Sequence, residues 1–218
     1  MIPRMSNSRA NIADSVTKYN AAYTVKKDYN PRPNAFLAQC LKRITPTRSK
    51  KRPKRRVRGR GRALDIGLGQ GRNALLLAQH GYAVTGIDHS EVGIRAAQRM
   101  AKARGLHIDA VIADTERFEY GRNRWDLIVL LYYPLPMVLM ERLKRAVRPG
   151  GHIVIERFSR PKHPRSASAA DWRETRRINP MLESLANWHV LLYENDEFTS
   201  DWHWDGESPR GPIVRLLA

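Results

Sequence analysis

The sequence has a single cysteine, no long apolar run and few acidic residues. Cys40 stands alone among 218 residues, which excludes an internal disulfide and a cysteine-based zinc site. The most apolar stretch, residues 127–140, contains two prolines and is too short to span a bilayer. The first 20 residues have no continuous apolar core, so no secretory signal is predicted. We therefore expect a cytoplasmic protein without a membrane segment.

The remaining composition is that of a globular protein. Apolar residues make up 42% of the chain and charged residues 28%, ordinary values that exclude a wholly disordered protein. A chain of this length forms one domain or two small ones, and it can fold without disulfides or metal ions. The seven histidines show no metal-ligand spacing, so we predict no metal site.

Acidic residues are scarce mainly in the first 62 positions, which hold 18 basic and 2 acidic side chains. Ten of these basic residues lie between Arg48 and Arg62, in a run interrupted by one proline and two glycines. Such a run cannot bury itself, so it predicts an exposed, flexible loop or linker. It could neutralise the phosphates of a nucleic acid. The simpler interpretation, a solvated linker, is favoured because no aromatic residue interleaves the run to stack on bases.

Apolar segments alternate with amphipathic segments along the rest of the chain. Short apolar runs predict strands over residues 63–66, 83–87, 108–113, 125–131, 152–158, 189–194 and 212–217. Helices are predicted over residues 35–44, 73–79, 90–104, 137–147 and 171–185. Asn34 and Ser90 are the expected caps of two of these helices. This alternation predicts an α/β fold whose largely parallel sheet is covered by helices on both faces.

The sharpest signal is Ala63-Leu-Asp-Ile-Gly-Leu-Gly-Gln-Gly-Arg-Asn73, in which an apolar strand runs through three glycines into a helix. Glycines allow a tight turn and let a ligand approach the backbone, and the helix N-terminus offers free N–H groups. Asp88 ends the next strand. A carboxylate there can accept hydrogen bonds from both hydroxyls of a ribose. The sequence therefore predicts a nucleoside-containing ligand at the carboxyl ends of the strands.

The glycine spacing distinguishes two such ligands. Dinucleotide-binding loops read G-x-G-x-x-G, whereas this loop reads G-x-G-x-G, with Arg72 where the third dinucleotide glycine is expected. Asp65 stands two residues before the first glycine. S-adenosylmethionine (SAM) carries an ammonium and a sulfonium group, so a nearby carboxylate suits SAM better than it suits a pyrophosphate.

At five places, and in the right order, the chain resembles the class I SAM-dependent methyltransferases. The matching segments are Asp65-Ile-Gly-Leu-Gly-Gln-Gly71, Gly86-Ile-Asp88, Ala113-Asp114-Thr115, Trp125-Asp126-Leu-Ile-Val129 and Arg148-Pro-Gly-Gly-His152. Gly69-Gln-Gly-Arg-Asn73 and Pro33-Asn-Ala-Phe-Leu37 look like the tellurite-resistance and thiopurine-type branch. The resemblance implies a Rossmann-like, doubly wound, mostly parallel seven-stranded sheet with an antiparallel C-terminal strand. The SAM-binding domain would span residues 63–218, after a helical cap segment at 1–47 and the basic linker at 48–62.

The resemblance also implies which residues bind SAM. Gly67 and Gly69 would lie against its methionine part, with Leu68 in the same loop. Asp65 would hold the loop and reach the amino group through water, although it could instead be purely structural. The remaining cofactor-binding residues would be Asp88 at the ribose, Asp114, Thr115 and His89 at the adenine, and Arg72 and Asn73 at the start of the next helix.

Methyl transfer needs the acceptor atom held in line about 3–3.5 Å from the methyl carbon. An oxygen or nitrogen acceptor also needs a base, whereas a thiolate does not. Candidate acceptor-side residues are Tyr132 and Tyr133, of which strand alternation would point one toward the pocket and one toward the core. Glu156 is the best candidate base, although it could equally pair with a neighbouring arginine, the interpretation we favour. Leu131-Tyr-Tyr-Pro-Leu-Pro136 is not the Asn/Asp-Pro-Pro-Tyr pattern of base and amide N-methyltransferases.

A small-molecule methyltransferase is therefore the favoured function. An RNA or protein methyltransferase is the alternative, with the run from Arg48 to Arg62 docking the substrate. This run comes directly before the strand that leads into the glycines, so we expect it to be tethered near the cofactor side of the sheet. A nicotinamide-dependent oxidoreductase is disfavoured by Arg72. A non-catalytic SAM-binding or nucleic-acid-binding module stays open, and no oligomeric state is predicted.

Overall fold

The computed structural model describes residues 16–17, 19–21, 23–24, 30–44, 59–158, 180–201 and 210–218. The strands are β1 Arg62–Ile66, β2 Ala83–Asp88, β3 Asp109–Ile112, β4 Trp125–Leu131, β5 Val147–Phe158, β6 Leu192–Thr199 and β7 Arg210–Leu217. The helices with defined bounds are α2 Ala35–Ile44, α3 Arg72–Gln79, α4 Glu91–Ala103, α5 Met137–Ala146 and α7 Pro180–Ser184. The described residues between 16 and 24 are also helical. None of the helices in these ranges is long and apolar enough to cross a bilayer.

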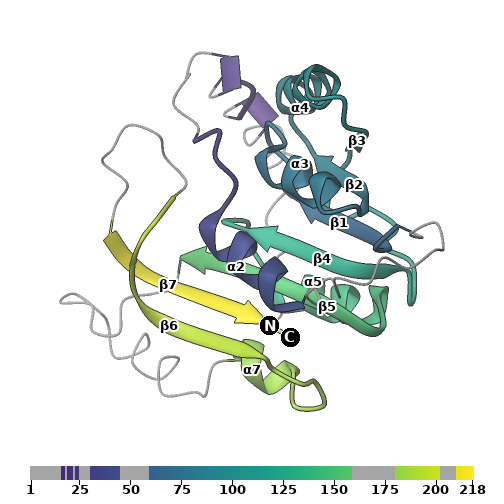
Figure 1. Ribbon diagram of the computed structural model, residues 1–218. Helices are drawn as coiled ribbons and strands as arrows, with labels where there is room; N and C mark the ends of the chain where they lie inside the picture. Colours follow the sequence, from purple (N-terminus) through teal and green to yellow (C-terminus); the bar gives the residue numbers. More distant parts are fainter. Residues whose placement is uncertain are drawn as a thin grey trace, which may run out of the picture.

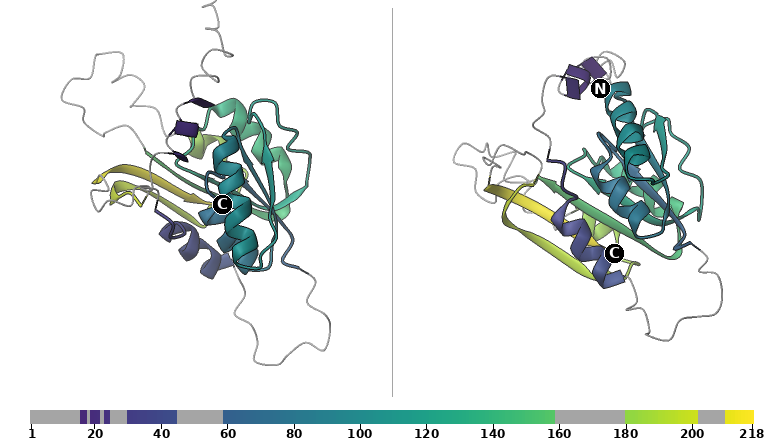
Figure 2. Two further views of the ribbon diagram at one scale, coloured as in Figure 1. Left: turned by 90° about the horizontal axis from the view of Figure 1, so that it is seen from above. Right: turned by 45° about the horizontal axis from the view of Figure 1, so that its top comes forward.

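The seven strands form one sheet in the order β3-β2-β1-β4-β5-β7-β6 (Figure 1). The first five strands are parallel, and β7 is antiparallel to both of its neighbours. The β6–β7 pair forms one end of the sheet (Figure 2). The predicted Rossmann-like sheet with an antiparallel C-terminal strand is therefore confirmed.

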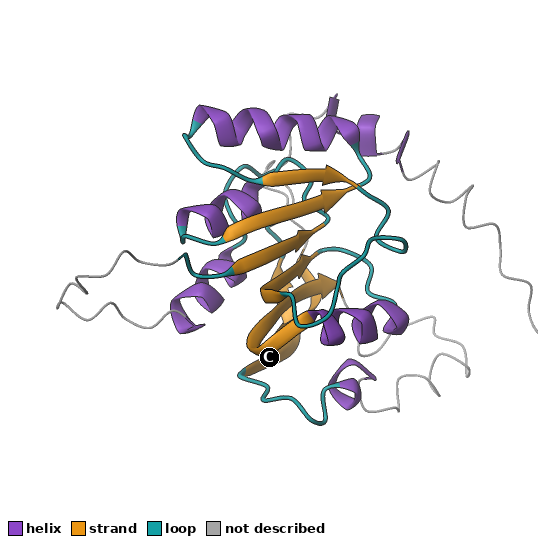
Figure 3. Cartoon of the chain, turned by 90° about the vertical axis from the view of Figure 1, so that its right-hand side faces the viewer, coloured by secondary structure: helices purple, strands orange, loops and turns teal. Residues whose placement is uncertain are grey.

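Helices cover both faces of the sheet (Figure 3). On one face α2, α3 and α4 pack around side chains such as Leu127. On the other face α5 and α7 pack around side chains such as Ile128. Successive residues of a strand point to opposite faces, so both faces of β4 are buried. This explains why β4 is a continuous apolar run rather than an alternating one.

The helix caps follow the local sequence. Asn34 Oδ1 accepts from the Leu37 N–H at 2.8 Å, and Ser90 Oγ accepts from the Gly93 N–H at 3.1 Å. Both predicted caps are confirmed, because a short polar side chain at this position satisfies a helix N–H that has no partner within the helix.

Two predicted boundaries are wrong, and a third lies outside the described residues. Strand β6 runs over Leu192–Thr199 rather than 189–194, because it is an outer strand whose polar residues resemble a loop in sequence. Strand β5 begins at Val147 rather than at residue 152, with a register shift opposite Trp125 and Leu127. Helix α7 ends at Ser184, and residues 171–179 of the predicted helix lie outside the described residues.

The direction of the parallel strands gives the sheet two distinct edges, here called the carboxyl edge and the amino edge. The glycine loop, residues 67–71, follows β1 at the carboxyl edge, whereas Arg62 begins β1 at the amino edge. Five residues of strand span roughly 16 Å. The expectation that the basic run is tethered near the cofactor side is therefore wrong, since its described end, residues 59–62, lies across the sheet. Residues 48–58 lie outside the described residues.

Candidate functional site

The glycine loop turns sharply from β1 into α3. Gly67, Gly69 and Gly71 have φ angles of 75°, 51° and 86°, a left-handed region that favours glycine. The N–H groups of Gly67 and Leu68 both donate to the Ile87 carbonyl at 2.9 Å, which ties the loop to β2. The backbone of this loop is therefore held at the carboxyl edge, next to the end of β2.

Asp88 lies at the end of β2, directly beside the loop. Its Oδ2 accepts from the Gly69 N–H at 2.8 Å, and its Oδ1 accepts from the Ser90 N–H at 2.8 Å. The residue is only 7% exposed. A carboxylate has about four acceptor positions, so it can still accept from two ligand hydroxyls.

Asp65, two residues before Gly67, is buried beneath the glycine loop. It accepts a hydrogen bond from the Ala74 backbone N–H, but its Oδ2 has no hydrogen-bond partner among the described residues. Burial raises the pKa of Asp65 to about 7, although the Arg72 guanidinium favours the charged form. An unpaired buried carboxylate oxygen is costly, and a ligand cation or bound water would satisfy it.

Asp114, Thr115 and His89 lie at the same edge, beyond β2 and β3. Asp114 Oδ1 accepts from the Glu116 N–H at 2.8 Å, and the Thr115 and Tyr133 hydroxyls are 2.9 Å apart. The His89 ring lies 5.5 Å from the Tyr19 ring, centroid to centroid. The structure thus brings the predicted adenine-side residues together beside Asp88.

Three residues of the N-terminal segment also reach this site and were not among the sequence candidates. Besides Tyr19, Asn20 accepts through Oδ1 from the Ser90 hydroxyl at 2.6 Å, and the Tyr23 hydroxyl lies against Gly69. A Cβ added to Gly69 would lie 2.8 Å from that hydroxyl. Spaced aromatics in a polar segment are too common a pattern to have identified these residues.

Two tyrosines cover the glycine loop. A Cβ added to Gly67 would lie 2.7 Å from the Tyr133 ring, and Tyr23 covers Gly69 in the same way. The cavity left beside the loop measures about 80 Å³ and is bordered by Asn30 and Tyr132. Sites for small molecules and cofactors usually measure roughly 300–1,000 Å³. A ligand the size of a nucleoside must therefore displace side chains from this site.

Strand alternation does not extend to the two tyrosines. The strand β4 ends at Leu131, and Tyr132 has a φ of 54°, in the left-handed region. The Tyr132 hydroxyl accepts from the Asp201 N–H at 3.3 Å, while the Tyr133 hydroxyl pairs with Thr115. Tyr132 borders the cavity, whereas Tyr133 packs against the core cluster that contains α5, and the turn brings both hydroxyls to polar partners.

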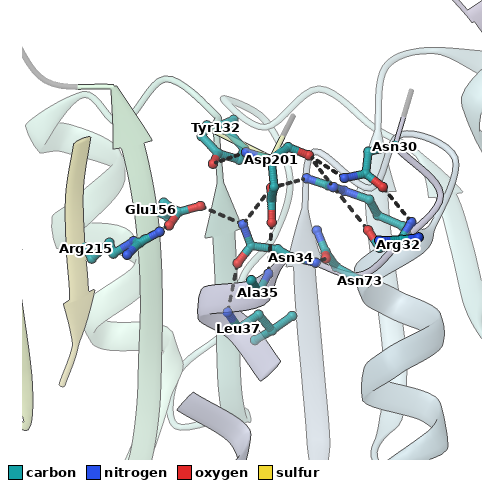
Figure 4. Close-up of polar contacts among 11 residues, drawn as sticks. Asn30, Arg32, Asn34, Ala35, Leu37, Asn73, Tyr132, Glu156, Asp201 and Arg215 are labelled. Carbon is teal, nitrogen blue, oxygen red and sulfur yellow. Dashed lines mark hydrogen bonds and ion pairs between the residues drawn. The ribbon is translucent and has the colours of Figure 1, made fainter. Parts of the chain in front are cut away.

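Asp201 contacts residues 30–35, the start of α3 and the turn after β4, on the other side of the cavity (Figure 4). Its carboxylate accepts from the side chains of Arg72 and Asn34, at 3.0 and 3.1 Å, and from the Ala35 N–H at 2.9 Å. Its carbonyl accepts from Arg72 and from Asn30. Asn73 Oδ1 accepts from the Asn34 N–H at 2.9 Å. Arg72 and Asn73 therefore hold the wall of the cavity, and no local pattern marked Asp201.

Glu156, on β5, is 1% exposed and fully engaged at its two oxygens. Its Oε2 accepts from Arg215 Nε at 2.5 Å, and its Oε1 accepts from Asn34 Nδ2 at 2.6 Å (Figure 4). Arg215 lies opposite it on β7, in register with it. Burial, followed by the Glu156 and Asp201 carboxylates, raises the pKa of the nearby Tyr132 hydroxyl. The arrangement keeps Tyr132 neutral.

Comparison with known proteins identifies this type of domain. Residues 63–151 match a family model described as a methyltransferase domain. The ubiquinone biosynthesis O-methyltransferase of Coxiella burnetii is 32% identical over 44% of this chain and 43% of its own length. The enzyme of the same name from Alkalilimnicola ehrlichii is 28% identical over 72% of this chain and 65% of its own length. The chain thus spans less than half of the Coxiella relative.

A solved structure shares the whole fold. The N-methyltransferase NodS from Bradyrhizobium japonicum, crystallised with S-adenosyl-L-homocysteine (SAH), superimposes with a TM-score of 0.59 at 20% identity, covering 95% of this chain and 97% of NodS. In this chain the unpaired Asp65 oxygen and the free acceptor positions of Asp88 both lie beside the glycine loop. Residues 63–151 therefore match a methyltransferase domain, and the chain has the fold of a methyltransferase.

Proposed function

We propose that the protein transfers a methyl group to a small-molecule acceptor. Bound SAM would supply both the methyl group and its leaving group. The observation that carries the use of SAM is that Asp88 and the buried, unsatisfied Asp65 both lie beside the glycine loop. The names of the two relatives, both O-methyltransferases, support a small-molecule acceptor.

In this proposal each cofactor residue has a physical task. Asp88 accepts from the ribose hydroxyls, and the unpaired Asp65 oxygen receives the ligand ammonium or a water bound to it. The loop residues Gly67, Leu68 and Gly69 present backbone to the methionine part. Asp114, Thr115 and His89 line the adenine.

The acceptor would lie in the cavity beside Tyr132. Glu156 is a poor base, because Arg215 and Asn34 occupy both of its oxygens. The neutral Tyr132 hydroxyl already donates to the Glu156 carboxylate, so it is not a base either. Glu156, Arg72 and Asn73 are therefore positioning residues. We favour an acceptor that loses its proton without a strong protein base, such as an acidic hydroxyl or a thiol.

The macromolecular alternative gains no support from the fold. The cavity beside the loop measures about 80 Å³ and must open even for the cofactor, so its size does not select the acceptor. The basic run enters the fold at the opposite edge of the sheet, so it gains no support as a docking arm for a methylated RNA or protein. Arg72 in place of the third dinucleotide glycine continues to disfavour a nicotinamide cofactor.

Calorimetric titration with SAH tests the cofactor site. We expect SAH to bind the unaltered protein with a micromolar dissociation constant, and we expect no binding of NADH. Asp88→Ala should weaken SAH binding roughly 100-fold, since it removes two hydrogen bonds to a charged acceptor. Asp109→Ala, an exposed carboxylate at the amino end of β3, is the control and should bind normally. NADH binding without SAH binding would refute the proposal.

The acceptor class needs a separate experiment. The protein is incubated with methyl-tritiated SAM and a cell extract, which is then separated into small molecules, RNA and protein. We expect the label in the small-molecule fraction and its loss with Asp88→Ala. Label in RNA or protein would overturn the acceptor assignment while leaving the cofactor assignment intact.

A further inference from the structure

Six exposed arginines gather at the amino edge, on the side of the sheet away from the cofactor site. They come from the chain before and at the start of β1, the turn before β4, the end of α5 and the start of β5. This amino-edge patch consists of Arg60, Arg62, Arg122, Arg124, Arg145 and Arg148.

Side-chain and backbone contacts place most of these arginines close together. The guanidinium groups of Arg62 and Arg124 both lie over the Trp125 ring, 5.3 and 4.8 Å from its centroid. Asp126 links β1 to β5. Its carboxylate accepts from the Arg62 N–H and pairs with the Arg148 guanidinium, each at 2.7 Å. The N–H of Asn123 donates to the Arg145 carbonyl at 3.0 Å, which brings Arg122 to the same place.

The amino-edge patch carries more positive charge than the neighbouring acidic side chains neutralise. Asp126 pairs with Arg148, but Arg122 and Arg145 form no ion pair within the described ranges. Basic residues at a helix C-terminus stabilise the helix dipole, which accounts for Arg145. The other five arginines lie outside helices, so helix stability does not explain them.

A cavity of about 490 Å³ opens directly beside the patch. Asn123 and Arg148 border it on one side, and the ring side chains of His152, Trp188 and His189 border it on the other. Volumes of this size hold small organic groups. Flat rings next to guanidinium groups are the combination on which nucleic acid bases stack while their phosphates are neutralised.

We propose that the amino edge binds single-stranded RNA, with phosphates on the amino-edge patch and a base in the adjoining cavity. One guanidinium group can donate two parallel hydrogen bonds to a phosphate, so a patch made only of arginines suits a phosphate backbone. The proposal does not depend on the methyl acceptor, since the patch and the glycine loop lie at opposite edges. It also does not depend on residues 48–58, which stay unchanged in the test.

The test measures fluorescence anisotropy of a fluorescein-labelled 20-nucleotide RNA of mixed sequence at 50–300 mM KCl. The patch variant is Arg60→Gln/Arg122→Gln/Arg145→Gln in the full chain. Its control is Arg95→Gln/Arg99→Gln/Arg210→Gln, which removes the same charge from exposed positions on α4 and β7. We expect the patch variant to bind at least tenfold more weakly. The slope of log K against the logarithm of the KCl concentration should become shallower by about 2, since each of the three lost phosphate contacts contributes about 0.7 for single strands.

Three outcomes would overturn the proposal. These are normal binding by the patch variant, an equal loss in the control, and binding of the unaltered protein to anionic phosphatidylserine vesicles but not to RNA. Unchanged SAH affinity in the patch variant shows that it is folded. His189→Ala, an exposed ring at the cavity, should weaken RNA binding severalfold without altering the salt slope, because stacking adds no charge. An unchanged affinity would overturn the base-binding part of the proposal.

Discussion

Asp65 is a carboxylic acid that folding removes from water while leaving one oxygen unpaired. Its burial disfavours the ionised form, so the folded protein holds a proton there up to about pH 7. The residue thereby destabilises the folded protein above about pH 7, which is in keeping with its proposed place beside a cationic ligand. Glu156 shows the opposite arrangement, a buried carboxylate with a partner at each oxygen. Removing one member of such a buried pair usually costs roughly 3–5 kcal/mol.

Asp65→Asn should change how stability depends on pH. The ordinary pKa of the group is 3.8 and the folded one is about 7, so between these values the folded state binds more protons than the unfolded state. The free energy of unfolding therefore falls as pH rises from about 4 to 7 and is level above. The variant has no ionisable group at this position, so its free energy of unfolding does not fall in this way. The Tm difference, variant minus unaltered protein, should therefore increase from pH 5 to pH 8. A difference independent of pH would contradict the prediction.

At the scale of elements, Asp201 joins the start of α2 and the start of α3 to the end of β6. The Arg72 contacts connect residues 129 apart, and the Asn34–Glu156 bond connects residues 122 apart. These bonds place α2 over the sheet beside β5 and close one side of the cavity. The geometry of the proposed acceptor site therefore depends on the C-terminal strands as well as on the glycine loop.

Asp201→Ala should loosen α2 more than the rest of the fold. It removes carboxylate hydrogen bonds to Arg72, Asn34 and Ala35, and we expect a loss of about 2 kcal/mol in the free energy of unfolding. Hydrogen exchange should quicken in Ala35–Ile44 but not in β1. Glu197→Ala, an exposed carboxylate on β6, is the control and should change neither. An equal increase in hydrogen exchange throughout the domain would contradict the prediction.

At the scale of the whole molecule, one sheet separates two charged regions. The carboxyl edge holds the carboxylates Asp65, Asp88 and Asp114, whereas the amino edge holds the arginine patch. Parallel strands produce this separation, since every strand begins at one edge and ends at the other. RNA bound at the amino edge should therefore not touch SAM.

Binding at the two edges should be independent. Saturating RNA is expected to leave the SAH dissociation constant within about twofold, and by linkage SAH should leave RNA affinity equally unchanged. Titrating SAH by calorimetry with and without the 20-nucleotide RNA measures this coupling. A change of fivefold or more would show that the two sites communicate or overlap.

Local sequence was sufficient for the elements and for the proposed cofactor loop. The positive φ angles of Gly67, Gly69 and Gly71 require glycine, and the caps Asn34 and Ser90 act within three residues of their own positions. Apolar runs identified central parallel strands such as β1 and β4 because these are buried on both faces. Asp65 was found because it lies two residues before the loop, and Asp88 because it ends the next strand along the chain.

Contacts between distant segments were decided only by the tertiary structure. Asp201, Arg215 and Tyr23 reach the site from far along the chain, and nothing in their local sequence indicates it. The edge at which the basic run enters the fold likewise depends on strand direction, which is a property of the assembled sheet. Sequence by itself determined the fold class, the glycine loop and its carboxylates, because these follow from backbone conformation and neighbouring residues. Tertiary structure decided which side chains close the cavity, because that requires the C-terminal hairpin to pack beside β5.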